Sequence, residues 1–414
     1  MKFIADFHIH SKYSRATSKD MDFETISQWA KWKGITLLGT GDFTHPLWLS
    51  EIKRKLKPIG NGLFSFSKVN YILSTEICNI FNANSKTKKI HTMVFAPSIQ
   101  VAEKINKELS RYCDLTSDGR PIIPLPLKNT IEIVFSASKD CVVVPCHIWT
   151  PHFSLFGANS GFDTFEECFE EYSRNIFAVE TGLSSDPQMN WEVQILNNIA
   201  LISNSDAHSP SKIGRECNVF DTELSYKGIF DAIKSFDPQK FLYTIEFFPQ
   251  EGKYYLDGHR NCKVSLMPKE SKKTKNKCPK CGNPLTIGVL NRIENLKKTN
   301  ANKKNLPPKA RIPYKNLIPL IEIISEAFDK DVDSAFVKDL YLKTIFSCGN
   351  EFDILLEKDF AFLSQNLHPL VVEGIKRVRG GQVKIECGYD GVYGKIKIFD
   401  KYERENFQRQ PKLF

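Results

Sequence analysis

Short apolar runs rich in Val, Ile and Leu alternate with helical patterns through the first half of this chain. Runs of this kind are typical of strands that are buried on both faces, and their alternation with helices favours parallel pairing. The runs cover residues 35–38, 69–73, 93–95, 141–144, 176–179 and 200–202. They predict an α/β domain whose strand ends gather at one edge.

Two histidines, His8 and His10, follow the first apolar run of the chain. Residues i and i+2 of a strand project from the same face, so both imidazoles can be directed at one metal ion. An isolated pair of this kind is as often a partly exposed pair without a ligand. The pair indicates a metal site only in combination with other possible ligands further along the chain.

Further His, Asp and Glu residues lie beside the later apolar runs: Asp42, His45, Glu76, His91, His147, Asp206 and His208. In barrels built from strands and helices, polar residues at several strand ends converge on one cleft. The set is therefore far more specific for a metal site than any one member.

The order His-x-His, Asp-x-x-His, Glu, His, His, Asp-x-His resembles the polymerase-and-histidinol-phosphatase (PHP) superfamily through roughly the first 220 residues. Residues 8–18, 39–46, 147–151 and 203–210 resemble endonuclease Q more closely. This resemblance implies a distorted βα-barrel, the PHP fold, that holds two or three metal ions. Two residues separate Asp42 from His45, whereas many members of the superfamily have an adjacent Asp-His.

The resemblance also implies the roles of the ligands. His8, His10, Glu76 and Asp206 would bind one divalent ion, either Zn, Mn or Mg, and Glu76 would bridge to a second ion on His91 and His147. Asp42, His45 and His208 would complete a third site or support the other ligands. Paired ions can activate water and stabilise a leaving oxygen, so no catalytic residue separate from the ligands is required.

Members of the endonuclease Q family nick DNA on the 5′ side of deaminated bases. The resemblance therefore implies damaged DNA as the partner, with hypoxanthine, uracil, xanthine or an abasic residue as the lesion and 3′-hydroxyl and 5′-phosphate products. Deaminated bases pair weakly or wrongly, so extruding one costs less than extruding a normal base.

Several residues near the predicted ligands are candidates for substrate binding. Lys12 and Arg15 follow His10, and Lys212 and Arg215 follow His208, so each pair could hold a phosphate. Trp149, Phe153 and Phe156 lie on an irregular segment after His147, where aromatic rings suit stacking on an extruded base. The same rings could instead form a small apolar core that holds this segment against the domain. Asn190 could either contact a nucleotide or cap a helix.

A separate element follows, in which His259-x2-Cys262 and Cys278-x2-Cys281 have the spacing of a structural zinc site. A redox Cys-x-x-Cys would not explain the upstream His and Cys. Lysine-rich segments at 269–277 and 297–304 favour contact with nucleic acid, although the second could be a solubilising linker.

Helical patterns return at residues 317–328, 333–346 and 367–379, followed by a hairpin with an Asp-Gly turn near residue 390. Residues 317–324 and 388–394 also resemble endonuclease Q. The predicted domains are 1–238 for the PHP nuclease, 239–296 for the zinc element, 297–399 for the helical region and hairpin, and 400–414 for a flexible tail.

The tail ends in Gln410-Pro-Lys-Leu413-Phe414, which resembles the pentapeptide by which bacterial repair proteins bind the sliding clamp. Gln410 would make polar contacts, while Leu413 and Phe414 would fill an apolar pocket. A match of five residues also fits an inert tail. This resemblance favours a bacterial-type member of the family.

Lys and Arg exceed Asp and Glu by 57 to 48, which suits an anionic partner but also an ordinary basic protein. Neither a leading apolar segment nor a long apolar run is present, so we expect a cytoplasmic protein without a membrane span. Most of the 11 cysteines occur singly, as reduced core thiols do.

The sequence therefore predicts a metal-dependent DNA repair endonuclease. One alternative is a PHP-type small-molecule phosphatase, which would leave the zinc element and the basic segments without a purpose. The other is a non-catalytic protein that binds DNA or the clamp, which the full set of metal ligands argues against.

Overall fold

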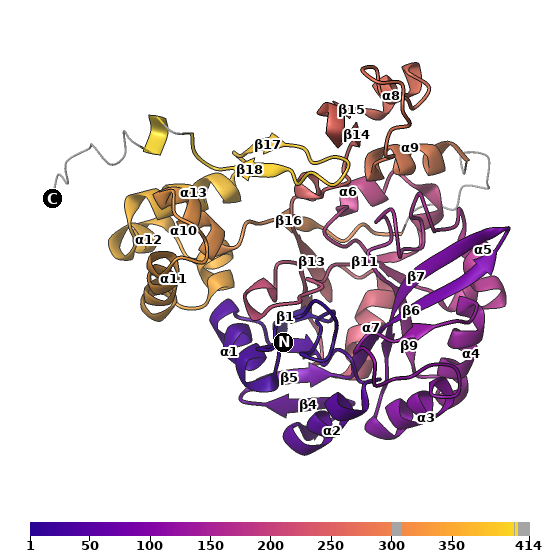
Figure 1. Cartoon of the computed structure of the whole chain (residues 1–414). Helices are drawn as coiled ribbons and strands as arrows, with labels where there is room; N and C mark the ends of the chain where they lie inside the picture. The colour runs from indigo at the N-terminus through magenta and orange to yellow at the C-terminus, as the bar shows by residue number, and fades with distance from the viewer. Residues whose placement is uncertain (300–308, 401, 405–414) are drawn as a thin grey trace.

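The computed structural model describes residues 1–299, 309–400 and 402–404. Its first half forms a mixed α/β body, which carries a small element built around residues 257–299 and a helical region beyond residue 317 (Figure 1). The basic segment after residue 299 and the tail motif at Gln410, Leu413 and Phe414 lie outside the described residues.

The larger sheet has eight strands in the order β16-β13-β12-β1-β2-β5-β4-β3. Parallel pairs join β1 to β2 and β2 to β5, as the apolar runs predict. The strands are β1 (Lys2–Asp6), β2 (Leu37–Gly39), β3 (Lys57–Gly60), β4 (Leu63–Phe66), β5 (Val69–Ile72), β12 (Cys217–Asp221), β13 (Phe241–Glu246) and β16 (Tyr314–Asn316). Because β13 and β16 belong to this sheet, the sheet continues beyond the boundary predicted at residue 238.

A second sheet has the order β8-β6-β7-β9, and β10 pairs with β11 in parallel. Their bounds are β6 (Ser74–Ala83), β7 (Lys86–Phe95), β8 (Ile122–Ile123), β9 (Val142–Pro145), β10 (Ala178–Glu180) and β11 (Ala200–Ile202). The prediction of parallel pairing is wrong for β7, which is antiparallel to both β6 and β9. Asn84 and Ser85 both have positive φ, of 51° and 58°, so they form the two-residue turn of a long hairpin.

Helices cover these sheets. Asp22 caps α1 by accepting a hydrogen bond from the Thr25 backbone N–H. The helices of this part are α1 (Phe23–Lys33), α2 (Pro46–Lys55), α3 (Ile99–Leu109), α4 (Leu127–Ala137), α5 (Phe165–Phe169), α6 (Pro187–Asn190) and α7 (Tyr226–Ser235). In the part of the chain that the structure describes, no helix has the length and apolar character needed to cross a bilayer.

The small element comprises β14 (Asp257–His259), β15 (Val264–Leu266), α8 (Pro268–Lys273) and α9 (Val289–Thr299). The buried carboxylate of Asp257 accepts hydrogen bonds from the Gly288 N–H and from the Ser271 and Asn291 side chains. One buried acid therefore connects the strand, the short helix and the long helix.

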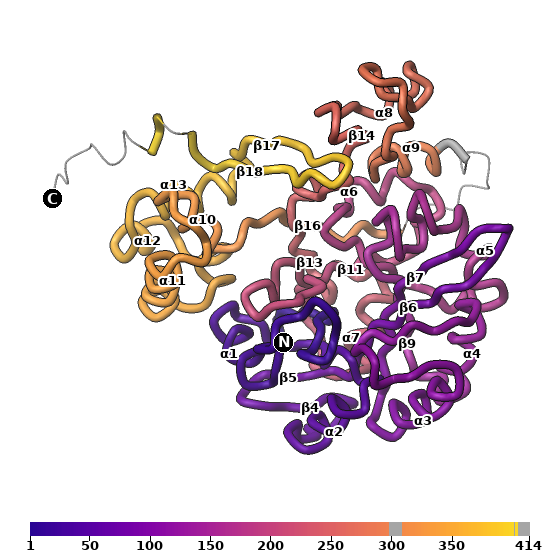
Figure 2. The backbone as a smooth tube through the Cα atoms, viewed as in Figure 1, coloured from indigo at the N-terminus to yellow at the C-terminus, as the bar shows by residue number. Residues whose placement is uncertain are grey.

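The helical region comprises α10 (Leu320–Phe328), α11 (Ala335–Cys348), α12 (Phe360–Asn366) and α13 (Pro369–Arg379), with a turn of π-helix at Asp353–Glu357. The hairpin of β17 (Lys384–Glu386) and β18 (Lys395–Lys397) follows and extends toward the small element (Figure 2). Its Asp-Gly turn is confirmed, since Asp390 and Gly391 both have positive φ. Asp390 accepts hydrogen bonds from the Arg260 N–H and the Thr286 hydroxyl.

A buried ion pair joins the helical region to the barrel. Lys33 Nζ, at the end of α1, lies 3.4 Å from Glu351, and the two side chains are 1% and 3% exposed. Glu351 also accepts hydrogen bonds from the Leu320 N–H and the Tyr341 hydroxyl. Removing one member of such a pair leaves a buried charge uncompensated.

We expect Lys33→Ala to lower the free energy of unfolding by about 3 to 5 kcal/mol, because Glu351 stays buried without its cation. Urea denaturation followed by circular dichroism measures the change. Lys31→Ala removes a lysine from the same helix turn whose ammonium contacts the exposed Ser67 hydroxyl, so it serves as the control. Equal stability of the two variants would contradict the role given to the pair.

Candidate metal centre

Four residues from three segments form the first group of ligand atoms. One ligand atom from each of His8, His10, Glu76 and Asp206 lies within 4.8 Å of the others. His10 Nε2 is 3.3 Å from Glu76 Oε2 and 3.1 Å from Asp206 Oδ1. His8 and His10 follow β1, Glu76 lies in β6, and Asp206 follows β11, so three strands supply the group.

Glu76 also belongs to a second group, with His91 and His147. Its Oε1 lies 2.7 Å from His91 Nδ1 and 3.2 Å from His147 Nε2, whereas its Oε2 faces the first group. The two oxygens of one carboxylate thus face two different sets of imidazoles, which is the arrangement that a bridging ligand requires.

The chemistry of these atoms fits divalent metal ions. Among the described residues, the buried His8 Nε2 has no hydrogen-bond partner, although carboxylate oxygens surround it. Burial lowers the pKa of His91 to about 4, so its ring is neutral near pH 7 and can act as a ligand. Although burial disfavours its charge, the pKa of Glu76 is held well below its usual range by His91, Arg120 and His8.

Glu180, at the end of β10, orients the first group and was missed by the sequence reasoning. Its carboxylate lies 3.0 Å from His8 Nδ1 and accepts hydrogen bonds from the His147 N–H and from Asn204. This contact turns His8 Nε2 toward Glu76 and Asp206. The available signal was its position directly after an apolar run, which it shares with the residues that were identified.

Asp42 supports His10 instead of joining either group. Its Oδ1 is 3.1 Å from His10 Nδ1, and its Oδ2 accepts hydrogen bonds from the Ser11 N–H and from the hydroxyls of Ser11 and Ser14. Of the two alternatives that the sequence left open, the structure favours support of another ligand.

The other two members of the predicted set are His45 and His208. His45 Nε2 is 3.1 Å from the Thr116 carbonyl, and its ring stacks on Tyr13 at 4.5 Å between centroids. The His208 ring lies 4.5 Å from that of His10, with Nδ1 bound to the Asp206 carbonyl. The structure therefore brings His208 close to the first group, whereas the contacts of His45 are with Thr116 and Tyr13.

Arg120 was also missed, because it lies on a segment without helix or strand, which a search for strand ends does not reveal. It donates a hydrogen bond to Glu76 Oε2 at 2.9 Å, so this loop forms part of the site. The neighbouring Gly119 lies so close to Asp42 and Ser14 that a Cβ atom would be 2.4 Å from both side chains. The close approach of this backbone explains why a glycine precedes Arg120.

Three site residues have left-handed backbone conformations, with φ of 46° at Asp42, 30° at His147 and 48° at Asp206. Non-glycine residues seldom adopt such angles, and those that do cluster at functional sites. Gly182 packs against His147, where a Cβ atom would lie 2.4 Å from that of the histidine. The surrounding packing thus fixes the directions of these side chains.

The aromatic segment after His147 is mostly part of the core. Trp149 and Phe156 are 1% and 0% exposed, and the Trp149 indole donates a hydrogen bond to Asn190. Of the two roles that the sequence left open for these rings, their burial favours packing over stacking on a base, and it also argues against nucleotide contact by Asn190. Phe153 differs, because it is only half-buried, and its ring lies 5.0 Å from that of His91.

The four basic residues that were predicted to bind phosphate all have acidic neighbours. Lys12 pairs with Glu51 at 2.9 Å, and Arg15 lies 3.4 Å from Asp118 with 69% of its side chain exposed. Lys212 and Arg215 both contact Glu322 of α10, at 3.1 and 2.6 Å. Arg15 is thus the candidate that is most open to a phosphate.

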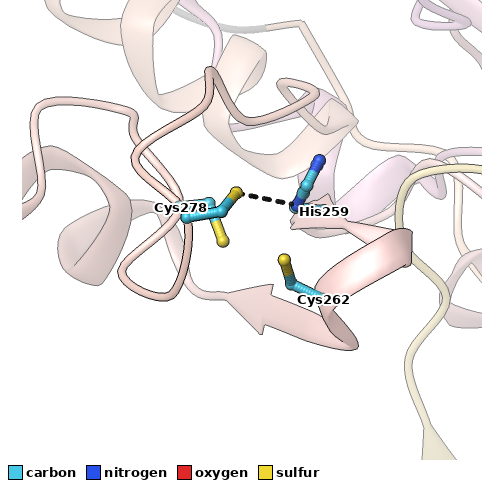
Figure 3. A group of neighbouring side chains, drawn as sticks. His259, Cys262 and Cys278 are labelled. Atoms are coloured by element: carbon cyan, nitrogen blue, oxygen red, sulfur yellow. Dashed lines mark hydrogen bonds between the residues drawn. The ribbon is translucent and has the colours of Figure 1, made fainter.

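The small element contains a third group, in which ligand atoms of His259, Cys262, Cys278 and Cys281 lie within 4.8 Å of one another. Figure 3 shows three of these side chains converging, and Cys281 Sγ is 3.5 Å from His259 Nδ1. Although burial opposes it, backbone N–H groups of Cys281 and Lys280 lower the pKa of Cys278 to about 7. The donor set and its spacing fit one tetrahedral zinc ion.

We expect Cys278→Ser combined with Cys281→Ser to lower the melting temperature and weaken DNA binding, because structural zinc contributes folding free energy. Metal analysis should show the loss of one zinc per chain. Cys113→Ser, which changes a half-buried thiol outside the group, should retain the full metal content. A double variant that melts like the parent would contradict a structural zinc.

Residues 319–382 match the family model of the MJ0043 C-terminal domain. Protein MJ0043 of Methanocaldococcus jannaschii is 36% identical over 60% of this chain, which spans only 31% of that protein's length. Protein YqxK of Bacillus subtilis is 28% identical over 96% of this chain and 99% of its own length.

Two solved structures resemble the whole chain. The lesion-specific endonuclease PfuEndoQ of Pyrococcus furiosus has a TM-score of 0.85 and 31% identity, covering 97% of this chain and 96% of its own. A structure of endonuclease Q in complex with a 27-mer duplex, which has an abasic lesion at the active site, has a TM-score of 0.84 and 30% identity. It covers 97% of this chain and 98% of its own.

Proposed function

This chain belongs to the endonuclease Q family, and we propose that it is a DNA repair endonuclease that hydrolyses the phosphodiester bond 5′ to a damaged nucleotide. The observation that carries the proposal is the position of Glu76, whose two oxygens face two separate groups of imidazoles. Such a bridged pair of sites is the arrangement used for in-line displacement at phosphorus.

Two groups of residues would hold the divalent ions. His8, His10, Glu76 and Asp206 would bind one ion, and Glu76, His91 and His147 the other. Bound there, the ions would supply an activated water and neutralise charge on the phosphate. His208 is the nearest candidate for completing a third site, since its ring contacts that of His10.

The chain's own residues prepare the site for this chemistry. Glu180 and Asp42 hold the Nδ1 atoms of His8 and His10, so both Nε2 atoms are directed at the same acidic residues. Arg120 places a positive charge beside Glu76 and offsets part of the negative charge that would repel DNA. Burial is the main cause of the lowered pKa of His208, which keeps its ring neutral near pH 7.

We propose that the lesions are hypoxanthine, uracil, xanthine and abasic sites, and that damaged bases are flipped out of the duplex. The half-buried Phe153 beside His91 supports this, because a ring at the edge of the metal centre can stack on an extruded base. Its lysine neighbour Lys89, with Nζ 5.2 Å from the ring centroid, adds a positive charge there. The low cost of extruding a mispaired base would start the selection.

The alternatives account for less of the molecule. A small-molecule phosphatase needs the metal groups but neither the small element nor the helical region that packs on the barrel. A protein that only binds DNA does not need the two groups that share Glu76. Clamp binding by Gln410, Leu413 and Phe414 stays a proposal, and deletion of residues 410–414 tests it in a pull-down with the sliding clamp.

We expect His8→Ala and Asp206→Ala each to lower the rate of nicking at least about 1,000-fold, because each removes a ligand from the first group. The assay uses a fluorescent duplex with one deoxyinosine in buffer of controlled metal content. Asp231→Ala, an exposed change on α7, is the matched control and should nick normally. More than about a tenth of the parent rate in either ligand variant would place the site elsewhere.

We expect Phe153→Ala to lower kcat/KM about 5- to 100-fold for deoxyinosine and deoxyuridine but much less for an abasic site, which has no base to stack. Measuring the three lesions in one duplex sequence makes the abasic substrate an internal control, and an undamaged duplex gives the background. A uniform loss on all three lesions would argue that Phe153 acts only through His91.

A further inference from the structure

The loop that carries Asp206 and His208 continues to two cations that contact the helical region. Arg215 Nη2 donates a hydrogen bond to Glu322 Oε1 at 2.6 Å, and Lys212 Nζ contacts the same oxygen at 3.1 Å. The guanidinium of Arg215 also lies 4.6 Å from the ring centroid of Phe247. Since its side chain is only 16% exposed, Arg215 is fixed between the barrel and α10.

Asp6 connects the two ends of this loop. The buried carboxylate accepts hydrogen bonds from the Ser205 N–H at 3.1 Å, from the Ser205 hydroxyl at 2.6 Å and from the Gly214 N–H at 2.9 Å. Ser205 directly precedes Asp206, and Gly214 directly precedes Arg215. A displacement of Arg215 would therefore be transmitted through one side chain to the backbone of Asp206.

The helix that presents Glu322 is itself held in place. Leu320, the first residue of α10, donates its N–H to Glu351, which forms the buried pair with Lys33 of α1. Glu322 lies in the first turn of α10. Although burial opposes its charge, Arg215 and Lys212 lower the pKa of Glu322, so it is ionised near neutral pH.

We propose that Glu322 is a positioning residue for the metal centre: by holding Arg215 and Lys212, it fixes the loop that presents Asp206. The helical region then supports hydrolysis although the ligand groups identified in the described residues all come from elsewhere. The kinetic part of this inference rests on the proposed nuclease function. Arg215 accordingly acts through the protein and not on a DNA phosphate.

The test compares Glu322→Gln with Glu326→Gln in the full-length chain. Glu326 lies one turn further along α10 and accepts hydrogen bonds from the Ile398 and Phe399 N–H groups. A glutamine oxygen can still accept both bonds from these neutral N–H groups, so this control leaves the contact with the barrel unchanged. Glu322→Gln instead removes the negative charge that two cations contact.

Two measurements are made on each variant. Without DNA, hydrogen exchange at the Ser205 and Gly214 amides should be about tenfold faster in Glu322→Gln and unchanged in Glu326→Gln. With the deoxyinosine duplex, kcat should fall about 10- to 100-fold in Glu322→Gln while KM changes less than about twofold, because the loss is one of alignment. Glu322→Arg combined with Arg215→Glu should recover part of both effects.

Parent-like exchange at both amides in Glu322→Gln would overturn the inference, as would the same effects in Glu326→Gln. A change in KM and its salt dependence with kcat intact would also overturn it, because Arg215 and Lys212 would then contact DNA phosphates. If the parent chain fails to nick damaged DNA while the exchange effect is present, the coupling is supported and the nuclease proposal is rejected.

Discussion

The centre of this structure depends on one buried carboxylate, Glu76, whose two oxygens lie against four imidazoles and a guanidinium. An ionised carboxylate away from water is unfavourable unless positive charge and hydrogen bonds surround it. Glu76 is also fixed in the ladder between β6 and β7, opposite Met93. Its position therefore constrains where the other candidate ligands of the two groups that share it can lie.

The residues around Glu76 mainly fix the orientation of the histidine side chains. A histidine presents one ring nitrogen to a metal when its other nitrogen is held, and Glu180 and Asp42 hold those of His8 and His10. The left-handed backbone at Asp206 and the close approach of Gly119 to Asp42 serve the same purpose. These features cost local stability, and the packing of the barrel offsets that cost.

Charged contacts connect the parts outside the barrel to it, in addition to the apolar core that they share with it. Lys33 and Glu351 form a buried pair, and Glu322 reaches the loop of Asp206 through Arg215. The hairpin contacts the small element through Asp390, which accepts a hydrogen bond from the Arg260 N–H. The region that matches the MJ0043 C-terminal domain is thus linked to the metal centre by a continuous series of contacts.

The sequence by itself determined the α/β class, the approximate positions of several central strands and the residues that form the three candidate ligand groups. These features follow from local pattern, since a strand end or a Cys-x-x-Cys turn is set by nearby residues. Only the tertiary structure decided that Asp42 supports His10, that Glu180 and Arg120 belong to the site, and that Trp149 is core. Each of those facts is a distance or a burial between segments that are far apart in the chain, and hydrophobic periodicity carries no information about which segments meet.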